Sequence, residues 1–155
     1  MATDQIVQAV PVKARPIAAV KFHARIADLG AHMGPAFGAT SGYLQRQGLP
    51  LRGPSVALYR PTAKGEFDVA AGFPVEQPIA GDGTVVPVDL PAGEAAVTTY
   101  IGAYEGLPAV YEAVLSWIRA QGREPGDLMW EEYFSEPTAP PEQTRTDVYW
   151  LLKAV

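Results

Sequence analysis

Hydrophobic residues in this chain follow two different periods, one typical of helices and one typical of strands. Helical spacing runs from about 29 to 47 and again from about 106 to 121, and a glycine, Gly48 or Gly122, stands at the end of each segment. Glycine is the preferred residue just past a helix C-terminus, so these positions predict where both helices stop. Asp28 stands where an N-terminal cap of the first helix is expected.

Alternation with a period of two, together with β-branched and aromatic residues, predicts the strands. The expected strands cover residues 17–26, 55–60, 66–73, 84–90, 95–101, 128–135 and 146–153. One helix per half of the chain, set among strands joined by short turns, predicts an α+β fold. We expect an antiparallel sheet with two helices on one face.

The chain also matches itself at an offset of 74 residues. This offset pairs Met33 with Leu107, Phe37 with Tyr111 and Tyr59 with Tyr133, and after a change to 79 it pairs Asp68 with Asp147. Each half then follows the order strand, helix, strand, strand. We expect two tandem β-α-β-β modules with pseudo-twofold symmetry, about 12–76 and about 84–155, within a single domain of residues 1–155.

Composition excludes several classes of function. The net charge is −5 with scattered basic residues, which argues against a nucleic-acid partner. Cysteine is absent and there are two histidines, so we expect neither a thiol nucleophile nor a metal, and no cofactor motif is visible. No hydrophobic run reaches membrane-spanning length, and a cytoplasmic location is the default expectation. The oligomeric state stays open.

The segment Trp130-Glu131-Glu132-Tyr133 places two adjacent carboxylates among aromatic side chains in a predicted strand. A carboxylate removed from water without a partner is strongly destabilising, so such residues need a reason. Negative charge beside ring faces attracts flat cations, which predicts a ligand site. The alternative is that both glutamates are solvated on an exposed face, or that Glu132 pairs with a basic residue.

Strand alternation assigns the faces. Glu131 and Tyr133 point to one side and Trp130 and Glu132 to the other. We predict that Glu131, Tyr133, Tyr149 and Tyr59 line a groove near the pseudo-twofold, whereas Val148, Trp150 and Leu152 form core against the helices. The further candidates for ligand contact are Trp130, Glu132, Phe37 and Met33.

The segment 126–137, GDLMWEEYFSEP, and the closing segment 145–152, RTDVYWLL, resemble the GyrI-like family of small-molecule-binding domains. That family's C-terminal signature is an aromatic–Glu–x–Tyr strand, a proline-containing loop and a Thr-Asp/Glu-x-Tyr strand. The resemblance covers nearly the whole chain. It implies a ligand groove between two β-α-β-β modules, with the family's acid at Glu131 and its tyrosine at Tyr133. Glu132, where an apolar residue is usual, leaves open which carboxylate meets the ligand.

Two functions follow from this resemblance. The first is a sequestering or sensing protein that binds bulky aromatic molecules, cationic or lipophilic, as multidrug-binding domains do. The second is a hydrolase that opens cyclopropane rings of DNA-alkylating natural products, with Glu131 or Glu132 as base and Tyr133 or Tyr149 as hydrogen-bond donor. A protein-inhibitory role, through an acidic surface that imitates DNA, is a third interpretation.

Overall fold

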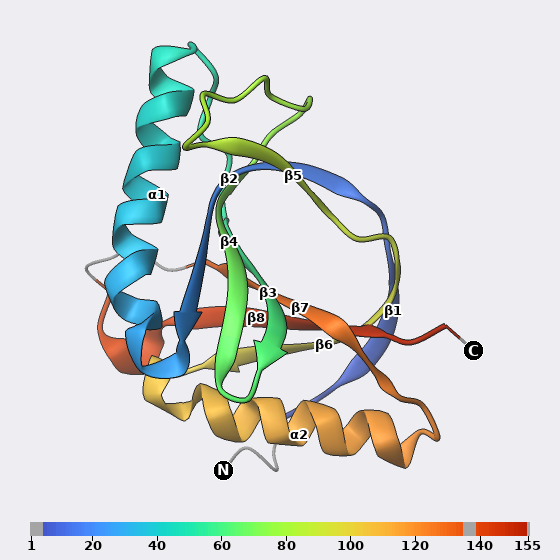
Figure 1. Cartoon of the computed structure of the whole chain (residues 1–155). Coiled ribbons are helices and arrows are strands. Elements are labelled where there is room, and N and C mark those ends of the chain that lie inside the picture. The colour runs from blue at the N-terminus through green and yellow to red at the C-terminus, as the bar shows by residue number, and fades with distance from the viewer. Residues whose placement is uncertain (1–4, 135–138, 155) are drawn as a thin grey trace. The chain divides into compact units, whose positions relative to one another are not determined.

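A computed structural model describes residues 5–134 and 139–154 of the chain (Figure 1). Contacts divide the chain into two compact units. Unit 1 combines Met1–Val12 with Ala92–Val155, and unit 2 is Lys13–Pro91. In the part of the chain that the structure describes, each unit holds one α-helix and four antiparallel strands, which confirms the α+β class.

Unit 2 places its helix α1 against strands β2 and β4. The strands follow the order β3-β4-β2-β5, and every pair is antiparallel. The elements in chain order are β2 (Arg15–Arg25), the short 3-10 helix η2 (Ile26–Asp28), α1 (Leu29–Arg46), β3 (Ser55–Ala63), β4 (Glu66–Pro74) and β5 (Val86–Leu90).

Unit 1 repeats this plan, with helix α2 against strands β6 and β7. Its strand order is β1-β6-β8-β7, again with antiparallel pairs. The elements are β1 (Gln8–Val12), β6 (Gly93–Ile101), η3 (Tyr104–Gly106), α2 (Leu107–Ala120), β7 (Pro125–Tyr133), η4 (Pro141–Gln143) and β8 (Arg145–Leu152).

The internal repeat is visible in the topology of each unit taken by itself. In both, the first strand is followed by the helix, and the third strand inserts between the first and the second, giving β2-β4-β3 and β6-β8-β7. An additional strand then pairs with the first one, β5 in unit 2 and β1 in unit 1. The unit boundaries therefore differ from the predicted modules, because β5 joins unit 2, and β1 is a strand that the alternation did not indicate.

One local prediction about the first helix needs correction. Asp28 occupies the N-cap position, but its side chain makes no capping hydrogen bond and its backbone is αR, because η2 leads directly into α1. The glycines at every fourth position of α1 do not mark close packing, because a Cβ built at Gly30, Gly34 or Gly38 would meet nothing within 4 Å. The predicted helix ends are confirmed, since Gly48 and Gly122 take φ of 68° and 73°.

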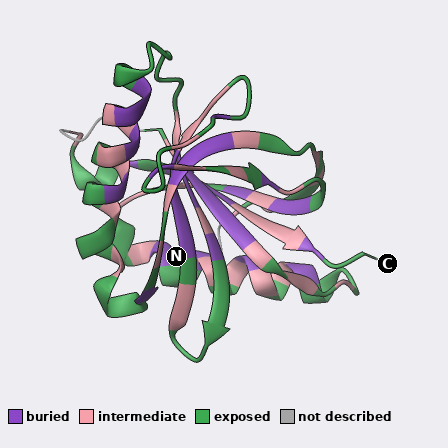
Figure 2. Ribbon diagram, turned by 45° about the horizontal axis from the view of Figure 1, so that its top comes forward, coloured by how far each residue is buried: buried purple, intermediate pink, exposed green. Residues whose placement is uncertain are grey.

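Buried residues lie in the middle of the strands and on the inner side of each helix (Figure 2). In α2, Leu107, Val110, Val114 and Ile118 are buried, at the three- and four-residue spacing of one helix face. In unit 2, the cluster of Ala18, Tyr43, Leu44, Ile79 and Val85 forms the corresponding core. Among the described residues, neither helix is long and apolar enough to cross a membrane.

On the surface of unit 2, His23 lies between two carboxylates of β4. Its Nε2 is 2.7 Å from Glu66 Oε1 and its Nδ1 is 2.9 Å from Asp68 Oδ1. Hydrogen bonds to Glu66 first, and then to Asp68, raise the pKa of His23 above its ordinary value of 6.5. All three side chains are exposed, so these contacts belong to the surface of unit 2.

This cluster predicts a pH-dependent contribution to stability. Because the pKa is raised in the folded state, the stabilisation is fully present below pH 6.5 and is lost as the pH rises through the folded-state pKa. The melting temperatures of wild type and His23→Gln should differ slightly at pH 6 and coincide at pH 9. The difference at pH 6 is small because exposed ion pairs contribute little to stability. A difference that grows toward pH 9 would contradict this assignment.

Candidate functional site

The acid singled out in the sequence lies on the face of β7 that helix α2 covers. Glu131 pairs with Val148 of β8, so these two side chains and that of Trp150 share one face of the sheet. Tyr111 of α2 contacts the same face, because its ring lies 6.4 Å from that of Trp150. The stripe of buried residues on α2 carries Tyr111 at its flank, four residues after Leu107 and three before Val114.

Glu131 is 2% exposed, and two tyrosine hydroxyls donate hydrogen bonds to its carboxylate. Tyr111 Oη donates to Oε2, and Tyr133 Oη donates to Oε1 at 2.6 Å. Hydrogen bonds to a charged acceptor are the strong kind, and they offset part of the cost of burying the charge. The carboxylate is thus held in one position by a helix residue and a strand residue.

Tyr104, in η3, extends this site toward solvent. Its ring meets that of Tyr133 edge-on, at 6.1 Å and 89°, and the residue is 52% exposed. Burial of part of the ring, followed by the negative charge of Glu131, raises the pKa of the Tyr104 hydroxyl. The charge of the buried acid therefore acts on an aromatic ring that solvent can reach.

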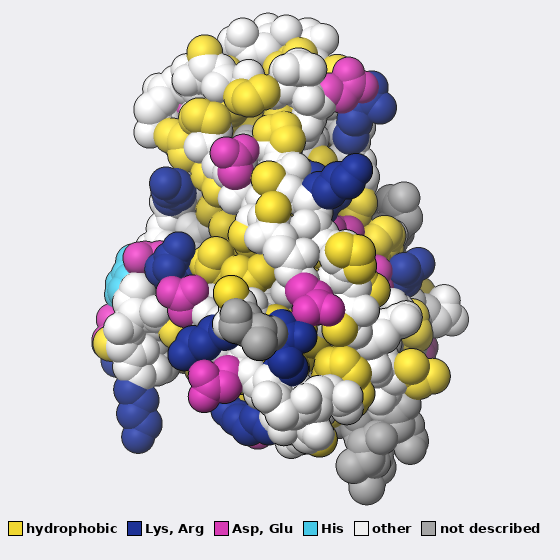
Figure 3. Space-filling view, turned by 90° about the vertical axis from the view of Figure 1, so that its right-hand side faces the viewer, with side chains coloured by type: hydrophobic (Ala, Val, Ile, Leu, Met, Phe, Trp, Pro, Cys, Tyr) yellow, Lys and Arg dark blue, Asp and Glu magenta, His cyan; other side chains and the backbone are white. Residues whose placement is uncertain are grey.

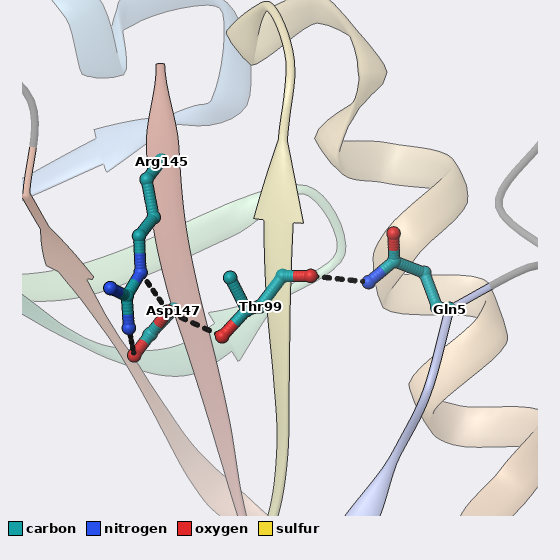
Figure 4. A network of polar contacts seen from close by, with 4 residues as sticks. All are labelled: Gln5, Thr99, Arg145 and Asp147. Carbon is teal, nitrogen blue, oxygen red and sulfur yellow. Dashed lines mark hydrogen bonds and ion pairs between the residues drawn. The ribbon is translucent and has the colours of Figure 1, made fainter. Parts of the chain in front are cut away.

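The opposite face of the same strands carries a separate polar network (Figure 4). Arg145 binds Asp147 through two hydrogen bonds of 3.1 Å, and Thr99 Oγ1 donates to Asp147 Oδ1 at 2.8 Å. Gln5 Nε2 donates to the carbonyl oxygen of Thr99 at 2.9 Å. Asp147 is 6% exposed, and its hydrogen bonds with Arg145 raise the pKa of the guanidinium.

Glu132 belongs to this second face, where it pairs with Asp147 across the strands. Trp130 also lies there, with its ring stacked on Tyr149 at 5.2 Å and 6°. The prediction that Tyr149 shares a face with Glu131 is therefore wrong. The prediction that Val148 and Trp150 lie toward the helix is right, but Glu131 lies on that side with them rather than across the sheet.

The other predicted ligand contacts belong to unit 2. Tyr59, in β3, is 7% exposed and its ring meets Phe67 at 6.2 Å. Phe37, in α1, meets Phe73 at 6.0 Å, and Met33 is half-buried on the same helix. Whether these residues join Glu131 in one groove stays a prediction.

A hollow of about 360 Å³ lies in unit 2, between the end of α1 and the segment that follows β4. It is lined by Tyr43, Leu49, Val75 and Ile79, among others, with the ion pair of Arg52 and Glu76 at its edge. None of the predicted ligand contacts lines it. On the molecular face that Figure 3 views, acidic and basic side chains are interspersed among apolar ones, so that face carries no patch of one charge sign.

Sequence reasoning did not select Tyr104 or Tyr111 as site residues. One signal was available for Tyr111, because the repeat aligned it with Phe37, which was selected. A phenol at the edge of an otherwise apolar helix stripe needs a polar partner when it is buried. Among the described residues, no group of three or more His, Asp or Glu side chains could hold a metal ion.

Residues 7–153 match the GyrI-like small molecule binding domain. No curated protein matches the sequence significantly. Among solved structures, the C-terminal domain of EcmrR has a TM-score of 0.77 at 16% identity, covering 98% of this chain and 99% of that chain. SAV2435 bound to tetraphenylphosphonium has a TM-score of 0.71 at 14% identity, with 96% and 94% covered. A hydrolase from Listeria innocua has a TM-score of 0.61 at 12% identity, with 95% and 91% covered. At these identities the likeness establishes the fold.

Proposed function

Since the match spans residues 7–153, the chain belongs to the GyrI-like small molecule binding domain family, and we propose that its ligands are bulky aromatic molecules, cationic or lipophilic. They bind against the tyrosines around Glu131. The observation that carries this proposal is a carboxylate that is 2% exposed, fixed by Tyr111 and Tyr133, and close enough to the half-exposed Tyr104 to raise its pKa.

Lipophilic cations suit such a site for two reasons. Their charge is spread over a large apolar surface, so they lose less hydration on leaving water than a compact ammonium ion does. Their rings gain stacking and cation–π contacts with tyrosines, worth about 0.5–2 kcal/mol each. Glu131 then supplies an attraction that a neutral ligand lacks. Affinities near micromolar, about −8 kcal/mol, and a broad ligand range are the expected result.

The charge of Glu131 is expected to matter more than that of its neighbour. Calorimetric titration of tetraphenylphosphonium, the ligand of the structurally similar SAV2435, should give about tenfold weaker binding to Glu131→Gln than to wild type, which corresponds to about 1.4 kcal/mol. Glu132→Gln is the matched control, because this acid lies on the opposite face of the sheet, and it should bind nearly as wild type does. Equal losses in both variants would remove Glu131 from its assigned role.

A ligand without charge tests whether the contribution of Glu131 to binding depends on the charge of the ligand. Triphenylphosphine oxide offers three phenyl rings and no net charge, so its binding should be weaker in wild type and insensitive to Glu131→Gln. A common loss for both ligands would mean that the substitution disturbs the site's shape rather than its charge.

Hydrolysis of a strained ring is the second candidate, because Glu131 and Tyr133 place a carboxylate and a hydroxyl side by side. In this reaction Glu131 takes a proton from water, and the hydroxide adds to a cyclopropane carbon as the ring bond breaks. The bond's electrons move into a conjugated ligand carbonyl, and the hydroxyl of Tyr133 donates a hydrogen bond to the resulting enolate oxygen. Glu131 then returns to the enolate the proton that it took from water, which completes the addition of water. Binding is preferred because both oxygens of Glu131 already accept hydroxyl protons. A water-added product, seen by mass spectrometry with a cyclopropane-bearing alkylator and absent with Glu131→Gln, would establish the enzyme instead.

A further inference from the structure

One buried hydroxyl on the face of Glu131 has no hydrogen-bond partner among the described residues. Thr146 of β8 is 0% exposed, and among the described residues its Oγ1 finds no hydrogen-bond partner. Among the described residues of unit 1, two other threonines are buried, and both hydroxyls are bonded. Thr98 Oγ1 donates to the carbonyl oxygen of Ile6, and Thr144 Oγ1 donates to the carbonyl oxygen of Pro140. A buried donor without a partner destabilises a protein, so its presence calls for a reason.

The strand register places Thr146 beside the tyrosines of the site. It pairs with Tyr133 on β7 and with Tyr100 on β6, so the three residues form one row across the sheet. Glu131, two residues before Tyr133, lies on the same face in the next row. Tyr104 covers this end of the face through its edge-on contact with Tyr133. The hydroxyl thus lies under the aromatic rings that the proposed ligand would contact.

We infer that Thr146 is a specificity-determining residue, whose hydroxyl bonds a polar substituent on a ring of the bound ligand. This inference rests on the proposed function and adds a chemical class to it: aromatic ligands that carry a phenolic hydroxyl or a similar group. A threonine hydroxyl both donates and accepts, so it suits either kind of substituent. Thr146 is fully buried, so the ligand reaches its hydroxyl by moving aside the ring of Tyr133, which pairs with Thr146 and is only partly buried.

A matched pair of probes isolates this contact. Tetraphenylphosphonium has no hydrogen-bonding group, and (4-hydroxyphenyl)triphenylphosphonium differs from it by one hydroxyl. Wild type should bind the hydroxylated cation about fivefold more tightly, the effect of one ordinary net hydrogen bond. Thr146→Val, which keeps the side chain's shape, should abolish this preference, and Thr146→Ser should retain it.

Stability supplies a readout that separates this role from a structural one. Thr146→Val removes a hydroxyl without a partner, so its melting temperature should equal or exceed that of wild type. Thr98→Val is the matched control. It removes a bonded hydroxyl on the same face, and it should melt at a lower temperature while keeping the preference for the hydroxylated cation.

The outcomes are distinguishable. If tetraphenylphosphonium binds in a Glu131-dependent manner but wild type shows no preference, or Thr146→Val keeps the preference, the role of Thr146 is overturned and the proposed function stands. A lower melting temperature for Thr146→Val would likewise overturn it, because the hydroxyl would then be structural. If neither phosphonium binds wild type, the proposed function fails and this inference fails with it.

Discussion

Replacing Tyr111 and Tyr133 together by phenylalanine is expected to lower the free energy of unfolding by about 3 kcal/mol at neutral pH. Each substitution removes a hydroxyl that donates to the carboxylate of Glu131, and hydrogen bonds to charged groups contribute about 1.5–3 kcal/mol each. The loss is large because the acceptor is 2% exposed, so water does not readily take the place of the hydroxyls. Urea denaturation followed by circular dichroism measures it.

The same double substitution in a Glu131→Gln background provides the control. A neutral amide is less costly to bury than a carboxylate, so removing the two hydroxyls should then cost much less. The difference between the two backgrounds is the coupling between the acid and the tyrosines. If the loss is the same in both backgrounds, the two hydroxyls stabilise unit 1 independently of the charge of Glu131, and the proposed coupling is contradicted.

Gly72→Ala is expected to have the largest effect on folding, a loss of at least about 3 kcal/mol or a protein that does not fold. Gly72 lies in β4, between its partners Val56 of β3 and Ala19 of β2. A Cβ at this position would lie 1.8 Å from the carbonyl oxygen of Ala18, which is backbone and has no rotamer to change. Because β4 is an inner strand of unit 2, the clash disturbs its pairing with β2.

Gly38→Ala makes the matched comparison within the same unit. A Cβ at Gly38 meets nothing within 4 Å in α1, so alanine should stabilise the protein by about 0.5–1 kcal/mol through its greater helix propensity. Urea denaturation of both variants gives the contrast. If Gly72→Ala folds with wild-type stability, the close approach of β4 and β2 at this position is contradicted.

The repeat made most of the fold predictable. The 74-residue offset carries Tyr59 of β3 onto Tyr133 of β7, and the 79-residue offset carries Asp68 of β4 onto Asp147 of β8. Self-similarity of this kind reports whole elements, so it is robust to errors at their ends. The repeat did not indicate strand β1, because this strand lies outside the repeated β-α-β-β order, at the edge of unit 1.

The faces of the site were less predictable, for a definite physical reason. Alternation sorts the residues of one strand into two sets, but it does not say which set of the next strand lies opposite. In the structure Glu131 pairs with Val148 and Trp130 pairs with Tyr149. The odd-numbered residues of β7 therefore share one face of the sheet with the even-numbered residues of β8. A register shift between Pro125 and Met129 adds to the uncertainty, since bulges leave little trace in a single sequence.

Contacts between a helix and a strand are harder still to read from sequence. Tyr111 meets Glu131 because α2 crosses β7 at that point, and a crossing point depends on packing rather than on any local motif. Glu131 itself was predictable, because a carboxylate among aromatic residues in a strand is unusual whatever its neighbours are. The sequence therefore singled out Glu131, which the structure buries and bonds to two tyrosines, but it did not indicate the contact with Tyr111.

In the proposed site, Glu131 is the carboxylate that meets the ligand. A crystal structure of the protein with bound tetraphenylphosphonium tests it most directly. The predicted result is a cation whose phenyl rings contact Tyr104 and Tyr133 and whose nearest carboxylate is that of Glu131. A cation bound beside Glu132 or Asp147, or seated in the hollow of unit 2, would contradict the claim.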